Sequence, residues 1–151
     1  METKAIYFDM DGTIADLYAV DGWLDMLRAY DTTPYEQAQV MLNMSHFARL
    51  LNGLQKQGYR IGIVSWLSKC PNPIYDLQVK WAKMQWLLKH LPSVHFDEIT
   101  IVSYGTPKSS VVHCPMGILF DDEQGNRTEW QGQAYQPQEI ITILKQLLQG
   151  V

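Results

Sequence analysis

The chain has 151 residues, of which 46% are hydrophobic and 19% are charged, and its formal net charge is −4. This length predicts one domain, and no apolar run approaches the roughly 20 residues of a membrane span. The absence of a Lys/Arg cluster argues against a nucleic-acid partner, while two cysteines and no pattern of a secretion signal predict a cytoplasmic protein with free thiols.

The first predicted element is a strand over residues 5–8, an unbroken apolar run typical of the centre of a parallel sheet. Helical spacing of apolar residues follows over 21–30, and again from Pro34 to 57 as one or two helices, with Gly58 as the expected stop. The later expected elements, in order, are a strand over 60–66, a loop over 68–76, a well-buried helix over 77–91, a strand over 98–103, a helical turn over 106–108, a strand over 116–120, a weak strand over 134–135 and a helix over 138–149.

Strands that alternate with helices predict right-handed crossovers and a parallel sheet with helices on both faces. The expected fold class is therefore α/β, a three-layer Rossmann-like arrangement. The whole of 1–151 forms one domain, and the only candidate accessory piece is a small insert over about 17–43, after the first strand.

Two aspartates follow the first strand directly. Asp9 stands at its carboxyl end, where ligands collect in open α/β sheets, and Asp11 comes two residues later. Carboxylates this close repel each other unless a cation lies between them, and oxygen ligands favour a hard ion such as Mg²⁺. The alternative is an ordinary solvated turn, since Asp and Gly are common turn residues.

Three other strands also end in polar side chains. Ser65 ends the second strand, Ser103 ends the third just ahead of Lys108, and the pair Asp121 and Asp122 follows the fourth. Each has a structural explanation of its own: a polar strand end, a solvated lysine, or a cap for the next helix. Because the carboxyl ends of parallel strands share one edge, we expect all of these groups to meet in one crevice.

The segments FDMDGT, IVSW, TPK and ILFDDE occur in the order and at the distances of the four motifs of the haloacid dehalogenase-like hydrolases, and the resemblance covers nearly the whole chain. It implies a Rossmann-like core, Mg²⁺-dependent phosphotransferase chemistry and a cap, which residues 17–43 would provide in a very small form. The acid at position 11 is typical of the phosphatase branch.

The resemblance also implies roles for individual residues. Asp9 would be the nucleophile that forms an aspartyl-phosphate and Asp11 the general acid and base. Ser65 would hold a phosphoryl oxygen and Lys108 would balance charge. Asp121 and Asp122 would bind Mg²⁺ together with Asp9 and the main-chain carbonyl of Asp11, with Asp122 favoured over Asp121 as the direct ligand.

Two further segments, KMQWLLKHLP and DDEQGNRTEWQG, resemble short 5'-nucleotidases of the deoxyribonucleotidase type. Trp66, Gly12 and Thr13 are candidates for contact with the substrate, and Trp130 is expected to be a packing residue. The remaining candidates for specificity are Trp23, Arg28, Tyr30, Lys69 and Tyr75.

The leading hypothesis is a phosphatase that acts on small phosphorylated metabolites, such as nucleoside monophosphates. Two alternatives stay open: the short cap would admit nucleic-acid ends or another macromolecule, and the fold could serve as a catalytically idle binding module. The sequence does not indicate which ester is cleaved or whether the chain forms an oligomer.

Overall fold

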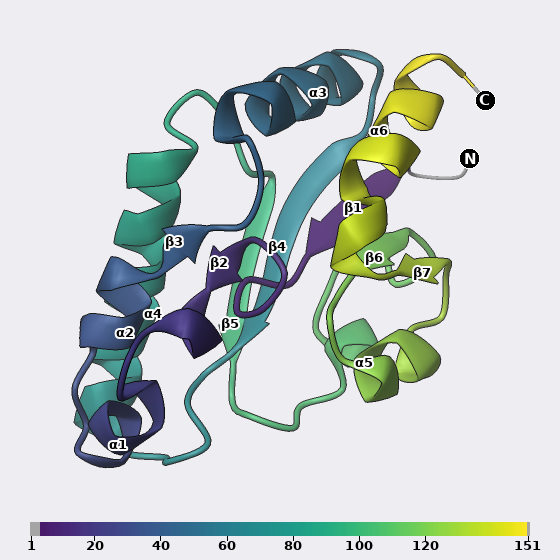
Figure 1. Ribbon diagram of the computed structural model, residues 1–151. Coiled ribbons are helices and arrows are strands. Elements are labelled where there is room, and N and C mark those ends of the chain that lie inside the picture. Colours follow the sequence, from purple (N-terminus) through teal and green to yellow (C-terminus); the bar gives the residue numbers. More distant parts are fainter. Residues whose placement is uncertain (1–3, 151) are drawn as a thin grey trace.

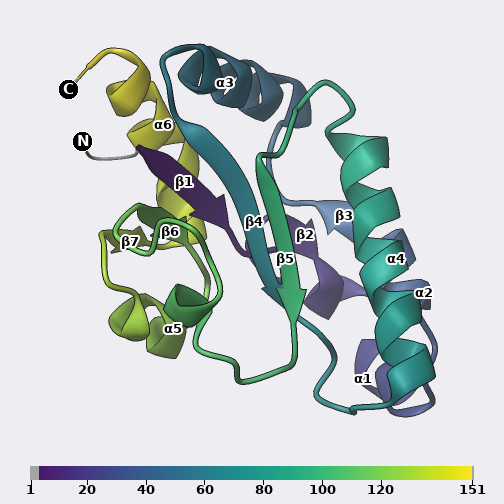
Figure 2. The same cartoon turned by 180° about the vertical axis from the view of Figure 1, so that it is seen from behind.

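The computed structural model describes residues 4–150. Five parallel strands form the central sheet in the order β5-β4-β1-β6-β7, with helices on both faces, as Figures 1 and 2 show. The α/β class and the parallel sheet predicted from the sequence are confirmed. The strands are β1 (Ala5–Phe8), β4 (Arg60–Trp66), β5 (Glu98–Val102), β6 (Ile118–Phe120) and β7 (Ala134–Tyr135).

Strand β1 is the middle strand of the sheet and lies between β4 and β6. Phe8 lies opposite Ile63 of β4 on one side and Phe120 of β6 on the other. Its four residues are at most 2% exposed, which explains why the run from Ala5 to Phe8 is apolar without alternation. This position carries the residue after β1 to the middle of the carboxyl edge of the sheet.

Most helices begin and end near the predicted residues, but the helical pattern expected from Pro34 to 57 is interrupted by a strand, Gln39–Val40, and the helix after β4 starts earlier than predicted. Pro73 starts α4, where the side chain of Asn72 accepts hydrogen bonds from the backbone N–H groups of Ile74 and Tyr75. The prediction of a loop up to residue 76 was wrong at its end, because proline is well tolerated in the first turn of a helix. The helices are α1 (Trp23–Arg28), α2 (Thr33–Gln37), α3 (Met44–Lys56), α4 (Pro73–His90), α5 (Gln124–Glu129) and α6 (Ile140–Leu148).

Each face of the sheet has its own core. Helices α3 and α6 and the C-terminal end of α4 pack on one face, and Figure 1 shows α3 and α6 in front of the strands. Trp130 packs on the other face, together with the segment that follows β5. Trp130 is 5% exposed and its indole N–H donates to the carbonyl of Gly117 at 2.8 Å, so it is the packing residue that the sequence predicted.

Residues 17–43 fold as a small layer beside α4. They contain η1 (Leu17–Ala19), α1, α2 and β3 (Gln39–Val40), which pairs antiparallel with β2 (Ala15–Asp16). Leu27 and Tyr35 of this layer pack against Tyr75 and Val79 of α4 in a separate hydrophobic cluster. The insert is therefore attached to the core through α4, next to the carboxyl edge of the sheet.

The expectation that the helix after the second strand is well buried was wrong for half of its circumference. Ile74, Leu77, Trp81 and Leu88 of α4 are 62–70% exposed, whereas Tyr75, Val79 and Trp86 are buried. Apolar residues all around a helix predict burial only if neighbours cover every side. Here the described part of the chain covers one side and leaves the other open.

None of the helices between residues 4 and 150 is both long and apolar enough to cross a membrane. The expectation that the chain lacks a secretion signal depends partly on residues 1–3, which lie outside the described range.

Candidate active site

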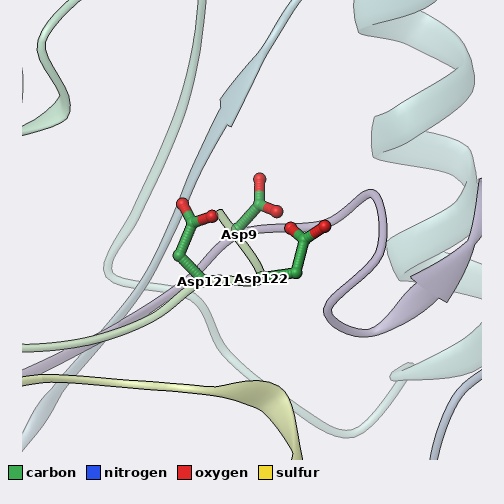
Figure 3. A group of neighbouring side chains, drawn as sticks. All are labelled: Asp9, Asp121 and Asp122. Carbon is green, nitrogen blue, oxygen red and sulfur yellow. The ribbon is translucent and has the colours of Figure 1, made fainter. Parts of the chain in front are cut away.

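Three carboxylates meet at the carboxyl edge of the sheet. Asp9 follows β1, while Asp121 and Asp122 follow the neighbouring strand β6, and Figure 3 shows the three side chains close together. One oxygen from each lies within 4.8 Å of the others, so the group could hold a metal ion. The sequence-predicted meeting of the first and fourth strand ends is thus observed.

Lys108 lies inside this group. Its Nζ donates to Asp9 Oδ1 at 2.9 Å and to Asp121 Oδ2 at 2.6 Å, and the residue is 1% exposed. Burial alone would lower the pKa of this ammonium, but the charges of Asp9 and Asp121 outweigh it and raise the pKa. Lys108 is therefore a fixed buried cation, unlike the solvated lysine that its sequence position also allowed.

The turn after Asp9 holds the carboxylate from the other side. The carbonyl of Met10 accepts hydrogen bonds from the backbone N–H groups of Thr13, Ile14 and Ala15, which closes a tight loop. Thr13 Oγ1 then donates to Asp9 Oδ2 at 3.0 Å. Both oxygens of Asp9 are thus engaged, one by Lys108 and one by Thr13, which fixes the carboxylate plane.

Gly12 is required in this loop for two reasons. Its φ of +81° lies in the left-handed region, which disfavours any residue with a side chain. A Cβ at this position would also lie 2.3 Å from Asp122 Oδ2. The backbone of the first motif and the carboxylate of the fourth therefore approach as closely as glycine allows.

The two carboxylates after β6 differ in their surroundings. Asp121 is fully buried and accepts from Lys108 and from Asn126 Nδ2, which is 3.2 Å away. Burial and the charge of Asp9 raise the pKa of Asp121 to about 6 and that of Asp122 to about 8. Lys108 offsets these effects at Asp121, whereas Asp122 forms no ion pair with a lysine or arginine among the residues that the structure describes.

A second buried lysine organises Asp11. Lys83 of α4 is 1% exposed, and its Nζ donates to Asp11 Oδ2 at 2.8 Å, to Ser65 Oγ at 2.7 Å and to the carbonyl of Trp66 at 2.7 Å. Burial raises the pKa of Asp11, and the positive charge of Lys83 opposes that rise. One ammonium group thus ties α4 to the first motif and to the end of β4.

Lys83 was not among the residues singled out from the sequence. A signal for it exists, because Val79 and Trp86 lie four residues before it and three after it, on the same side of a helix. Both are buried, so a lysine at this position faces the core. Ser65 is 0% exposed and binds Lys83, and it is absent from the wall of the adjacent cavity.

A cavity of about 500 Å³ opens above Asp9, Asp11 and Lys108. Its walls come from the insert over 17–43 and from the loops after β4 and β5, and they are rich in aromatic rings. Tyr18 packs edge-on against Trp23, and Trp66 packs against Tyr104. The residues that form these walls and that the sequence did not single out include Tyr18, Leu24, Leu27, Tyr35, Leu67, Ser68 and Tyr104.

The predicted substrate contacts divide into two groups. Trp66 lines the cavity, with its indole N–H donating to the carbonyl of Thr106 at 2.8 Å, and Trp23, Arg28 and Lys69 line it as well. Gly12, Thr13, Tyr30 and Tyr75 do not line this cavity. The rings of Tyr30 and Tyr75 pack on each other. Contact of any of these residues with a substrate stays a prediction.

Comparison with known proteins was made by sequence and by structure. No protein-family model matches the chain, and no curated protein matches its sequence. A chain of the Pnkp1/Rnl/Hen1 complex superposes with a TM-score of 0.58 at 18% identity, over 89% of this chain and 46% of that one. This chain therefore spans less than half the length of that neighbour.

A second solved structure matches over almost the full length of both chains. It is the D,D-heptose 1,7-bisphosphate phosphatase from Burkholderia thailandensis, with a TM-score of 0.55, 13% identity, and coverage of 96% of this chain and 98% of that one. At such identities the likeness shows the fold alone. It agrees with the predicted fold class: the chain has the Rossmann-like α/β fold that its four motifs imply.

Proposed function

We propose that the chain is a Mg²⁺-dependent phosphomonoester hydrolase that works through an aspartyl-phosphate on Asp9. One observation carries the proposal: Asp9 lies at the floor of a cavity with both carboxylate oxygens fixed, beside a buried ammonium and a second acid, Asp11. Phosphoryl transfer depends mainly on positioning and on charge stabilisation, and this arrangement supplies both. The fold shared with a solved phosphatase supports the same conclusion.

In the first step a carboxylate oxygen of Asp9 attacks phosphorus and the bond from phosphorus to the ester oxygen breaks. Asp11 gives its proton to the departing oxygen. In the second step water attacks the aspartyl-phosphate, Asp11 takes the proton from that water, and inorganic phosphate leaves with the Asp9 carboxylate restored. Throughout, the ammonium of Lys108 offsets negative charge on Asp9 and on the phosphoryl group.

The surroundings of Asp11 suit an acid that must exchange protons. Burial raises the pKa of Asp11 toward a range in which it can carry a proton, while Lys83 limits that rise so that the carboxylate form is also accessible. The three oxygens that receive hydrogen bonds from Lys83 also hold the ammonium in place, so the carboxyl of Asp11 has a fixed orientation.

The carboxylates of Asp9, Asp121 and Asp122 fit a hard divalent cation. Their donor atoms are all oxygen, and the raised pKa of Asp122 agrees with the lack of an ion pair to this carboxylate within residues 4–150. When bound there, Mg²⁺ would neutralise these carboxylates and polarise a phosphoryl oxygen. Asp122 is the better direct ligand, because Lys108 and Asn126 already engage Asp121.

The walls of the cavity favour a substrate with a flat ring, and we propose nucleoside monophosphates as the first class to test. Trp66 and Tyr104 on one side, and Tyr18 and Trp23 on the other, offer ring faces and edges to a base. A volume of about 500 Å³ lies within the range of pockets that enclose small organic ligands.

The test is a panel of phosphomonoesters with and without Mg²⁺: nucleoside monophosphates, sugar phosphates, an aryl phosphate and a 3'-phosphorylated oligonucleotide. We expect turnover that requires Mg²⁺ and is highest on the nucleotides, and loss of turnover in Asp9→Asn, with circular dichroism as the check that this variant is folded. Near-normal rates in Asp9→Asn would refute the role of Asp9. Inactivity on the whole panel, with Mg²⁺ still bound, would support a binding module instead.

A further inference from the structure

The outer side of α4 carries a stripe of exposed apolar side chains, Ile74, Leu77, Trp81 and Leu88. They are 70%, 69%, 68% and 62% exposed, and they recur at intervals that place them on one side of the helix. Figures 1 and 2 both show α4 along one flank of the molecule. Single exposed apolar residues are ordinary, but a contiguous row of this size marks an interaction site.

The opposite side of the same helix is fully committed to the fold. Tyr75, Val79, Lys83 and Trp86 are each at most 2% exposed, and Lys83 reaches Asp11 from this side. Rotation of α4 to bury the stripe would therefore remove the hydrogen bonds of Lys83 from the candidate active site. Within residues 4–150 nothing covers the stripe, so its partner is another surface.

We propose that the partner is a second copy of the chain, which pairs with the first through α4 in an antiparallel, two-fold arrangement. Ile74 and Leu88 lie two turns before and two turns after Trp81. A two-fold axis at Trp81 therefore places Ile74 of each copy beside Leu88 of the other, stacks the two indoles and sets Leu77 beside Gln85 at the edge of the stripe. A self-complementary patch of this kind is what an isologous interface requires.

The area of the stripe matches what a weak dimer needs. When fully open, an aromatic side chain such as Trp81 presents about 150–250 Å² and an aliphatic one somewhat less, so the four at 62–70% exposure offer roughly 500 Å² per copy. Two copies would then bury roughly 1,000 Å², at the lower limit for a specific interface. Interfaces at this limit belong to weak complexes, and we expect a dissociation constant in the micromolar to tens of micromolar range.

The rim of the stripe is polar, with little charge. Gln78 and Gln85 are exposed and lie on one side of it, and the same antiparallel register places Gln78 opposite Met84 and Gln85 opposite Leu77 of the other copy. The exposed charged residues of α4 are Lys80 and Lys89, both cations. Added salt would screen their mutual repulsion, so dimerisation should be unchanged or stronger at high ionic strength.

The first experiment is sedimentation velocity over a concentration series with three proteins: the wild type, Trp81→Glu, and Met116→Glu. Met116 is 71% exposed but lies outside the stripe, so it controls for the loss of an exposed apolar side chain. We expect Trp81→Glu to weaken dimerisation at least about 100-fold, as expected for a central aromatic anchor, and Met116→Glu to leave it unchanged. A concentration of about 300 µM is far above the dissociation constant expected for the proposed dimer. A wild type that remains a 17.4 kDa monomer up to this concentration overturns the proposal.

The second experiment tests the register by disulfide trapping in a Cys70→Ser, Cys114→Ser background. A mixture of Ile74→Cys with Leu88→Cys keeps Trp81 in both copies and places one thiol opposite the other, and disulfides form when Cα atoms lie about 4.4–6.8 Å apart. Leu77→Cys would lie about 12 Å from its own copy along the antiparallel helices, at 1.5 Å per residue. Cross-linking in the mixture of Ile74→Cys with Leu88→Cys is expected, and cross-linking of Leu77→Cys with itself overturns the antiparallel arrangement.

Discussion

Replacement of Lys83 by methionine tests how the candidate active site is held together. The variant keeps the length of the side chain and removes the ammonium, which leaves Asp11, Ser65 and the carbonyl of Trp66 without their shared donor. Loss of one partner from a buried ion pair costs about 3–5 kcal/mol. The Asp11 side chain is 17% exposed, so hydration of its carboxylate offsets part of that cost. We therefore expect a loss of about 2–3 kcal/mol in the free energy of unfolding.

In a domain of this size that loss lowers the melting temperature by about 5–10 °C. The assay combines thermal unfolding with steady-state kinetics, and Lys56→Met, an exposed lysine in α3, is the control. We expect Lys83→Met to reduce kcat at least about 10-fold with little change in KM, because a displaced Asp11 weakens proton transfer and leaves binding intact. Wild-type stability and wild-type kcat together would refute the role of Lys83.

Two further predictions concern the carboxylates. Gly12→Ala should lower both the free energy of unfolding and the affinity for Mg²⁺, because a Cβ there would lie 2.3 Å from Asp122. In the control Gly125→Ala in α5, the added Cβ has no neighbour within 4 Å, so the free energy of unfolding should rise by about 0.5–1 kcal/mol. Calorimetry measures the change in stability and titration measures the change in Mg²⁺ affinity. The pKa values of Asp121 and Asp122, about 6 and about 8, lie above the ordinary value of 3.8. Without divalent ions, the free energy of unfolding should therefore fall as pH rises from about 4 to about 8, and added Mg²⁺ should reverse that fall. A melting temperature that does not change with pH would contradict the raised pKa values.

The sequence predicts the strand ends well for a physical reason. A buried parallel strand is apolar on both sides, so the change to Asp9 after β1 and to Asp121 after β6 marks the sheet edge without any knowledge of the fold. Because all carboxyl ends share that edge, the meeting of Asp9 and Asp121 follows from topology alone, whereas the place of Lys108 depends on the path of the loop after β5. Distances within the group do not, since they depend on the turn closed by Gly12 and Thr13.

What the sequence does not reveal depends on which neighbours cover a helix. Residues 77–91 are apolar on several sides, and that pattern cannot say that Val79 faces the core while Trp81 faces solvent. For the same reason the sequence pattern alone did not identify Lys83 as buried. Its burial can be inferred only from its position on the same side of the helix as Val79 and Trp86. The start of α4 was misplaced because Pro73 was taken as a loop residue, although Asn72 before it is a good N-cap.

The central claim is that Asp9 carries the phosphoryl group, and trapping of the covalent intermediate tests it most directly. The protein is mixed with a ³²P-labelled phosphomonoester and Mg²⁺, quenched in acid within milliseconds, digested and mapped by mass spectrometry. We expect acid-stable, hydroxylamine-sensitive label on the peptide that contains Asp9, and none in Asp9→Asn. Steady turnover with the label absent, or with the label on another residue, would contradict the account.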